Sequence, residues 1–530
     1  MYQNRSIRPI LSLLAAVALT MSNANTTPAA EFPNHDRRIL YNSDSGNVLS
    51  EFTSEVEDVD QIKAILETAI DELAAAGVDT FAPVTCYQFF SVIGPSDVLE
   101  QQWQFHTGWN TECWRRLAKA GIDARKLIAD RCHKNGMEFV ACIRMNDRHG
   151  GKRGKIIRDN PDWRLKGIGG GQAADFAQEP VRELLLAYIE EVLNSGDVDG
   201  IEFDYMRWAH MFQPGQGSAN AHLLTELTRK ARKLLDDAAK RMGRSSLILG
   251  VRVPQTDREC EYLGFDLATW IKEDLIDYVV QSDFFFIDYN TRVAELVKLA
   301  QGTRCRIYPS ISPNIGVGYE SRYHNVANYR AAAHSFYAQG ASGVQAYNYQ
   351  YYWGGKRGHR YLWPGALGYL KQLKDPEQIA RHDRHYRFYP LWPNAQQTGF
   401  AHDDRIRLDR SEAEPQGRQR FRLYEDLSGS NVSAVLQLKA VGLKSDESIR
   451  INVNGNPVPD QHIHKFVRPG QGTDKGKELP AFIQHAFSLD WMPNPIVMGD
   501  NELTIHLNKA KASEGKVTID DLEVYVYVRR

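Results

Sequence analysis

Two acidic residues stand two positions apart in the segment 199–207, which reads DGIEFDYMR. If this segment is a β-strand, Glu202 and Asp204 share one face, and the apolar side chains between them share the other. Two neighbouring carboxylates in a confined site repel each other, which yields one ionised and one protonated group. Glycosidic bond hydrolysis uses such a pair. The alternative is a structural salt-bridge cluster, with Arg144 or Arg252 on neighbouring strands as the cation.

The acid that assists Asp204 is expected on another strand. We predict Asp283, near the end of a strand over Tyr278–Phe286, as this partner. Glu202, Asp44 and Glu320 are further candidates. The predicted catalytic residues are therefore Asp204, Glu202 and Asp283, and the separation of the two reacting carboxylates would decide between retention and inversion.

Residues that suit sugar binding are expected around these acids. Sugar hydroxyls need paired donors and acceptors, whereas the C–H faces of sugars stack on aromatic rings. The predicted substrate-binding residues are Asp44, Arg144, Asn146, Arg207, Arg252, Gln281, Tyr308, Gln345, Tyr347 and Trp353. Further aromatic residues of a sugar-binding rim are Trp103, Trp109, Tyr351 and Tyr352. Packing within loops is the alternative explanation for each aromatic residue taken singly.

Alternating strands and helices must position these residues. The eight expected strands are Arg38–Tyr41, Val78–Val84, Glu138–Met145, Val198–Met206, Leu247–Pro254, Tyr278–Phe286, Cys305–Ile311 and Gly343–Tyr349. Helical periodicity separates them, and three helices are expected to end at Gly77, Gly243 and Gly340. Eight strand–helix units predict a (β/α)8 TIM barrel of the α/β class, whose active sites lie at the carboxyl ends of the strands. A doubly wound sheet is the alternative, but no glycine-rich phosphate-binding pattern follows the first strand.

The hydrophobic period changes to two after the barrel. Alternating apolar residues and the turn signal Asn454-Gly455 predict a smaller all-β sandwich with a structural or accessory role. The expected division is a barrel over 32–376, a linker over 377–395 and a sandwich over 396–530.

The amino terminus predicts export. Arg5 and Arg8 precede an apolar run over Ile10–Met21 and a small-residue stretch, which is the order found in secretory signal peptides. The run is too short for a membrane span, so residues 1–24 are expected to be removed and the protein to be periplasmic or secreted. Of the six cysteines, Cys86 and Cys113 could close one loop, and the others are expected as buried free thiols. No pair has metal-site spacing, so we expect neither a metal nor a cofactor.

The overall charge is nearly balanced, but two loops are locally basic. Lys and Arg total 64 and Asp and Glu total 66, and the resulting pI of about 6.8 favours neither nucleic acid nor a membrane surface as a partner. Two basic loops, over 148–158 and 356–360, are expected on the catalytic face. Such loops suit an anionic sugar, uronate or sulfated, although solvated loops are the simpler explanation.

The segment 199–207 resembles the fourth strand of the family-10-like glycosyl hydrolases of bacterial secreted proteins. The resemblance extends to Asn160–Trp163, Asp175–Ala177 and Glu179–Arg182, and so covers most of the barrel. It implies a (β/α)8 barrel, glycosidic bond cleavage and Asp204 as the catalytic acid. The segment is also similar to the family 18 chitinase signature, but Met206 occupies the place of the catalytic Glu.

Two functions therefore remain open. The first is a secreted glycoside hydrolase with a carbohydrate substrate and Asp204 as general acid/base or nucleophile. The second is a non-catalytic carbohydrate-binding protein on a degenerate barrel. The oligomeric state, the sugar and the linkage stay open.

Overall fold

The structure is a computed structural model of the 530-residue chain. It describes residues 37–44, 53, 56–87, 90–101, 111–147, 155–167, 173–195, 198–206, 208–283, 287–312, 325–349, 366–388, 404–429, 431–470, 473–474, 477–490, 495–509 and 513–529. Residues 1–24 and the basic loop 356–360 lie outside these ranges, as does the basic loop 148–158 up to residue 154.

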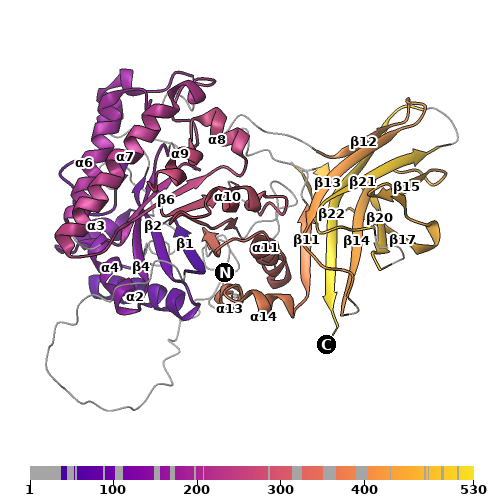
Figure 1. Ribbon diagram of the computed structural model, residues 1–530, viewed down its shortest axis with the longest axis horizontal. Coiled ribbons are helices and arrows are strands. Elements are labelled where there is room, and N and C mark those ends of the chain that lie inside the picture. The colour runs from indigo at the N-terminus through magenta and orange to yellow at the C-terminus, as the bar shows by residue number, and fades with distance from the viewer. Residues whose placement is uncertain are drawn as a thin grey trace, which may run out of the picture. The chain divides into compact units, whose positions relative to one another are not determined.

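The first part of the chain forms a parallel barrel (Figure 1). Its strands are β1 (Ile39–Ser43), β2 (Thr80–Tyr87), β4 (Glu138–Arg144), β5 (Gly200–Asp204), β6 (Ile248–Val253), β7 (Tyr278–Gln281), β8 (Arg306–Ile307), β9 (Ser310–Ile311) and β10 (Val344–Tyr347). Strands β8 and β9 are two halves of one strand, interrupted at Pro309, whose nitrogen carries no hydrogen. Because β8 pairs with β7 and β9 pairs with β10, this segment closes the ring. The predicted (β/α)8 barrel is therefore confirmed.

Helices surround the strands (Figure 1). They are α2 (Val59–Ala75), α3 (Glu112–Lys119), α4 (Ala124–Lys134), α5 (Lys155–Asp159), α6 (Glu179–Asn194), α7 (Gly217–Met242), α8 (Asp257–Leu263), α9 (Leu267–Lys272), α10 (Val293–Leu299), α11 (Val326–Ala338), α13 (Leu367–Gln372) and α14 (Pro376–Ala380). The apolar stripe of α2 is buried, as its periodicity predicts. The three glycines expected at helix ends all have positive φ, for example +67° at Gly243 after α7.

The second part of the chain is an all-β domain. Its strands are β11 (Arg384–Phe388), β12 (Ile406–Asp409), β13 (Gln416–Leu423), β14 (Val432–Val441), β15 (Ser448–Val453), β16 (Asn456–Pro457), β17 (Ile463–Arg468), β18 (Thr473–Asp474), β19 (Lys477–Glu478), β20 (Phe482–Ser488), β21 (Gly499–Asn508) and β22 (Lys516–Val528). One antiparallel sheet has the order β11-β22-β14-β20-β17, with β12 also paired to β22, and another has the order β13-β21-β15-β16. Alternate residues of β14 and β21 are buried, as expected for sheets with one covered face.

The range 377–395, expected as a linker, contains part of α14 and the whole of β11. Strand β11 pairs with Leu522–Val526 of β22 and so belongs to the all-β domain. The expectation that Cys86 and Cys113 close a loop is wrong, because all six cysteines are buried free thiols.

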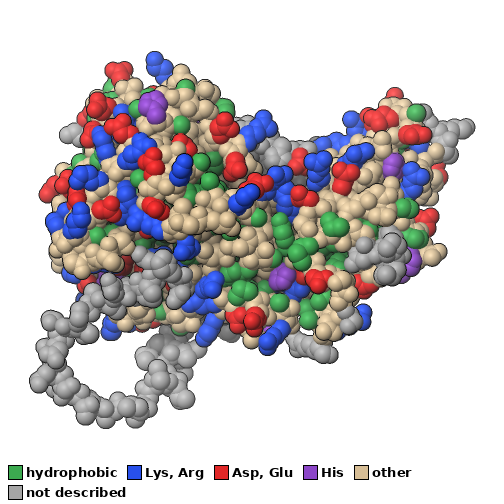
Figure 2. All heavy atoms as spheres, in the orientation of Figure 1, with side chains coloured by type: hydrophobic (Ala, Val, Ile, Leu, Met, Phe, Trp, Pro, Cys, Tyr) green, Lys and Arg blue, Asp and Glu red, His purple; other side chains and the backbone are tan. Residues whose placement is uncertain are grey.

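Charges of both signs are interspersed on the visible surface, including that over α6 and α7 (Figure 2). Lys230 of α7 and Glu183 of α6, for example, form an ion pair with an N–O distance of 2.8 Å. Among the described residues, no helix is both long and apolar enough to cross a membrane.

Candidate active site

Strand β5 directs its two acids into the barrel because its other face is apolar. The Tyr205 ring that follows the strand lies 4.5 Å from the ring of Phe265 and 6.1 Å from that of Trp270 on α9. These contacts hold the apolar face of β5 against the helices. Glu202 and Asp204 therefore point inward, as the alternation predicts.

Glu202 is enclosed in the middle of the barrel. It has no exposed surface, and it accepts hydrogen bonds from Tyr278 Oη (2.8 Å), Gln345 Nε2 (2.7 Å) and Asn42 Nδ2. Burial raises the pKa of Glu202, and the nearby charge of Asp204 raises it further. The three donors come from β7, β10 and β1. Glu202 thus links four strands, and both of its carboxylate oxygens accept hydrogen bonds from the protein.

Asp204 lies one layer nearer the carboxyl ends of the strands. Arg252 Nη1 of β6 donates to Asp204 Oδ1 over 2.9 Å, and neither side chain is exposed. The Met206 N–H donates to the same oxygen, also over 2.9 Å. The other oxygen, Oδ2, is buried and accepts no hydrogen bond from the described residues. Asp204 is therefore an ion-paired carboxylate, one of whose oxygens is held by two donors.

Arg252 is itself held on several sides. Its guanidinium carbon lies 3.6 Å from the centroid of the Tyr347 ring, which suits a cation–π contact. Its Nη2 donates to Ser282 Oγ (2.8 Å) and to the backbone carbonyl of Asp283 (3.3 Å). These contacts fix the orientation of the Arg252 guanidinium towards the Asp204 carboxylate.

A second ion-pair group lies beside this one. Arg144, which is paired in register with Asp204, forms ion pairs with Asp44 and with Asp147, the latter over 2.7 Å. Asn348 has a φ of +46° and donates from Nδ2 to Asp44 Oδ2 over 2.9 Å. This end of the barrel thus brings together three aspartates and two arginines.

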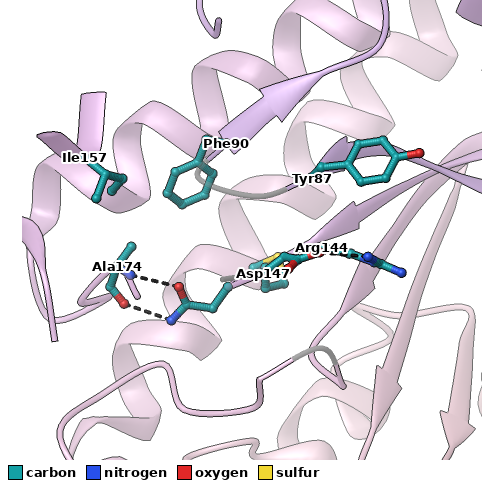
Figure 3. A pocket seen from close by; sticks show the side chains of 8 residues that line it. Tyr87, Phe90, Arg144, Asp147, Ile157 and Ala174 are labelled. Atoms are coloured by element: carbon teal, nitrogen blue, oxygen red, sulfur yellow. Dashed lines mark hydrogen bonds and ion pairs between the residues drawn. The ribbon is translucent and has the colours of Figure 1, made fainter. Parts of the chain in front are cut away.

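A small cavity with room for about one water molecule lies next to Arg144 (Figure 3). Its lining residues are Tyr87, Phe90, Arg144, Met145, Asn146, Asp147, Ile157 and Ala174. Figure 3 shows the Phe90 ring and Ile157 across the cavity from Ala174. Phe90 has a φ of +57°, which is unusual for a bulky residue and is a form of strain found at ligand sites. The cavity combines an aromatic wall with charged groups, as sugar sites do.

Some predicted residues lie elsewhere. Gln281 donates to the backbone carbonyls of Gln255 (3.0 Å) and Arg292 (3.4 Å). Successive side chains point to opposite faces, so the side chain that reaches Arg252 in the barrel interior is that of its neighbour Ser282. Tyr308 lies near the amino end of the barrel, where its hydroxyl contacts the Arg37 carbonyl. Asn146 lines the cavity, but its amide holds the backbone of Ala174 and His210.

The backbone carbonyl of Asp283 accepts a hydrogen bond from Arg252, and the Asp283 residue is 9% exposed. Other predicted residues lie outside the described ranges: Trp103, Trp109, Arg207, Glu320, Tyr351, Tyr352 and Trp353.

Sequence reasoning missed Asn42, Asp147, Tyr278, Ser282 and Asn348. Asn42 and Tyr278 occupy inward positions of their strands, and this strand phase is a signal that could have identified them. The contacts of Asp147 and Asn348 depend on loop conformation and have no comparable signal.

Comparisons with known proteins found no matching family model and no matching curated protein. Among solved structures, the chain is similar to a GH36 α-galactosidase from Geobacillus stearothermophilus, with 14% identity and a TM-score of 0.39 over 86% of this chain. It spans 56% of that α-galactosidase. It is also similar to an α-amylase from Geobacillus thermoleovorans, with 12% identity and a TM-score of 0.40 over 90% of this chain and 99% of the other.

A third similar structure is the glycoside hydrolase domain of PgaB from Bordetella bronchiseptica. The identity is 11% and the TM-score 0.42, over 64% of this chain and 99% of that domain. At these identities and TM-scores, the similarities identify neither a family nor a substrate for this chain.

Proposed function

We propose that this protein is a glycoside hydrolase in which Asp204 acts as the nucleophile or general base. The observation that carries the proposal is the position of the Asp204 carboxylate, which lies at the carboxyl end of β5 and is ion-paired with Arg252. Barrel enzymes keep their catalytic residues at this end of the strands. An ion-paired carboxylate suits the attack on, or the stabilisation of, the positively charged transition state of glycoside cleavage.

The neighbouring groups support this assignment. Arg252 orients Asp204 through its Oδ1 oxygen, and Glu202 acts as a positioning residue one layer below. Asp44 and Asp283 retain accessible surface, so they are the candidates for the second carboxylate. The small cavity between Arg144 and the Phe90 ring would hold a group no larger than about one hydroxyl of a substrate.

We further propose that the protein is exported, that it is related to the family-10-like glycosyl hydrolases, and that its substrate is anionic. The anionic preference rests on the basic residues of 148–158 and 356–360. Within the described residues, Arg144 and Arg252 are already paired with carboxylates, so these two add no net positive charge.

The test is cleavage of a panel of neutral, uronate-containing and sulfated oligosaccharides by the full chain. Asp204→Asn is expected to lower kcat by roughly 10²–10⁴-fold, the usual effect of losing a catalytic acid or base. This variant also leaves Arg252 without its carboxylate, which itself costs stability. Glu138→Gln is the matched control, because it breaks a similarly buried pair with Arg37 at the other end of the barrel.

Each outcome is decisive. Equal losses of kcat in Asp204→Asn and Glu138→Gln would refute the catalytic assignment. Equal binding of neutral and anionic oligosaccharides at low salt would refute the anionic preference.

A non-catalytic carbohydrate-binding protein is the second candidate function. It is favoured by one observation, that Asp44, Asp147 and Asp204 are all paired with arginine. Binding of oligosaccharides by the wild-type chain without cleavage of any of them would establish this candidate instead.

A further inference from the structure

The all-β domain contacts the segment that follows β7 from both of its sheets. Asn290 Oδ1 accepts from the Arg422 N–H of β13 over 2.8 Å, and the Asn290 carbonyl accepts from Arg422 Nη1. On the other side, the Tyr289 ring lies 5.8 Å from the ring of Tyr386 and 6.1 Å from that of Phe388, both on β11. Tyr289 is 1% exposed, so the contact is enclosed.

Hydrogen bonds lead from Asn290 back towards the barrel mouth. The Asn290 N–H donates to Asp288 Oδ1 over 2.7 Å, which forms a tight turn. With the Gln255 amide oriented so that its oxygen accepts from the Asp283 N–H (3.0 Å), its nitrogen donates to Asp288 Oδ2 (2.9 Å). Gln255 of the loop after β6 therefore joins Asp288 directly to Asp283.

The last step reaches the candidate catalytic carboxylate. The Asp283 carbonyl and Ser282 Oγ both accept from Arg252 Nη2, and Arg252 Nη1 donates to Asp204. Ser282, Asp283 and Arg252 are buried, whereas Gln255, Asp288 and Asn290 are partly exposed. Each link of the path is a hydrogen bond of 3.3 Å or less.

We infer that the all-β domain is a positioning element of the candidate active site, and that Arg422 is its positioning residue. By holding Asn290, Arg422 fixes the Asp288–Gln255–Asp283 connection and hence the orientation of Arg252 towards Asp204. This inference gives the domain a role in catalysis that does not require it to bind a sugar. It rests on the proposed function for its kinetic part, whereas its structural part is independent of that function.

The test compares two arginines of the all-β domain in the full chain. Arg422 pairs with Asp500 over 2.5 Å. Arg410 pairs with Glu447 over 2.6 Å, and its side-chain hydrogen bonds to described residues all stay within the all-β domain. Arg422→Ala is expected to lower kcat by roughly tenfold to a hundredfold, since small displacements of a catalytic group have effects of this size. Arg410→Ala is expected to leave kcat unchanged at temperatures where the domain is folded. Arg422→Lys should recover part of the loss, because it restores a side-chain donor to the Asn290 carbonyl, whereas the backbone N–H of residue 422 donates to Asn290 Oδ1 in every variant.

Hydrogen exchange supplies a second measurement that needs no activity. In Arg422→Ala, the amides of Asp283, Asn290 and Thr291 should exchange roughly tenfold faster, whereas Arg410→Ala should leave them unchanged. Unchanged exchange at these amides would overturn the inference, as would equal kcat values for the two alanine variants. If the wild-type chain cleaves no glycan, the proposed function fails while the exchange measurement still decides on the connection.

Discussion

Gly250 of β6 leaves no room for a side chain in the barrel interior. It lies opposite Glu202 in the β5–β6 register. A Cβ added there would lie 2.0 Å from Cζ of Tyr278 and 2.5 Å from its hydroxyl, and real Cβ contacts are not closer than 3.0 Å. Gly250→Ala would therefore displace the Tyr278 ring and break its 2.8 Å hydrogen bond to Glu202.

The expected cost combines two effects. Inserting a methyl group into a packed core typically costs about 1–3 kcal/mol. A buried hydrogen-bonding group left without its partner costs a further ~1–3 kcal/mol. Gly250→Ala should therefore lower the free energy of unfolding by about 2–6 kcal/mol.

Urea unfolding followed by tryptophan fluorescence measures this effect, because Trp114 and Trp270 are buried in the barrel. Gly368→Ala in α13 is the control, since its added Cβ meets no atom within 4 Å. It should be neutral or stabilising. In a Tyr278→Val background the cost of Gly250→Ala should nearly vanish. A loss below about 0.5 kcal/mol in the wild-type background would refute the reasoning, since that is the size of an ordinary surface substitution.

Two further predictions concern pH. Because burial raises the pKa of Glu202 above its ordinary 4.5, the folded barrel binds a proton more readily than the unfolded chain, so stability should fall as pH rises above 4.5. Glu202→Gln should abolish this fall in urea midpoints measured across the pH range, and a slope equal to that of the wild type would contradict the assignment. Burial lowers the pKa of His485 on β20 from 6.5 to about 4, so stability should be lost as pH falls between these values, by about 3 kcal/mol at most. His485→Leu should flatten the acid side of the unfolding profile of the all-β domain, whereas a loss unchanged by this substitution would show that other groups cause it.

The barrel was predictable because its signals are local. The three helices that end at glycines, such as Gly243, have an apolar period of 3.6 residues and a residue that tolerates positive φ. The inward direction of Glu202 and Asp204 followed in the same way from the apolar residues between them. Each of these features depends on residues close together in the chain.

The depth of a residue inside the barrel was not predictable. Tyr308 and Tyr347 were both expected on strands, yet Tyr308 lies between β8 and β9 near Arg37, and Tyr347 of β10 lies against Arg252. The stagger between neighbouring strands decides how far along the barrel axis an inward side chain lies, and no short segment of sequence encodes this stagger. Strand β11 shows the same limit, because its partner β22 lies more than a hundred residues further along the chain.

The two acids of β5 show why residue type and strand phase do not suffice to identify a catalytic group. Glu202 and Asp204 are two residues apart on one face, about 7 Å along the strand. Glu202 accepts from side chains of three other strands and has no exposed surface. Asp204 is equally buried but keeps one oxygen without a donor among the described residues. The two acids therefore differ in their partners rather than in their burial, and a contact pattern of this kind depends on strands far apart in the sequence.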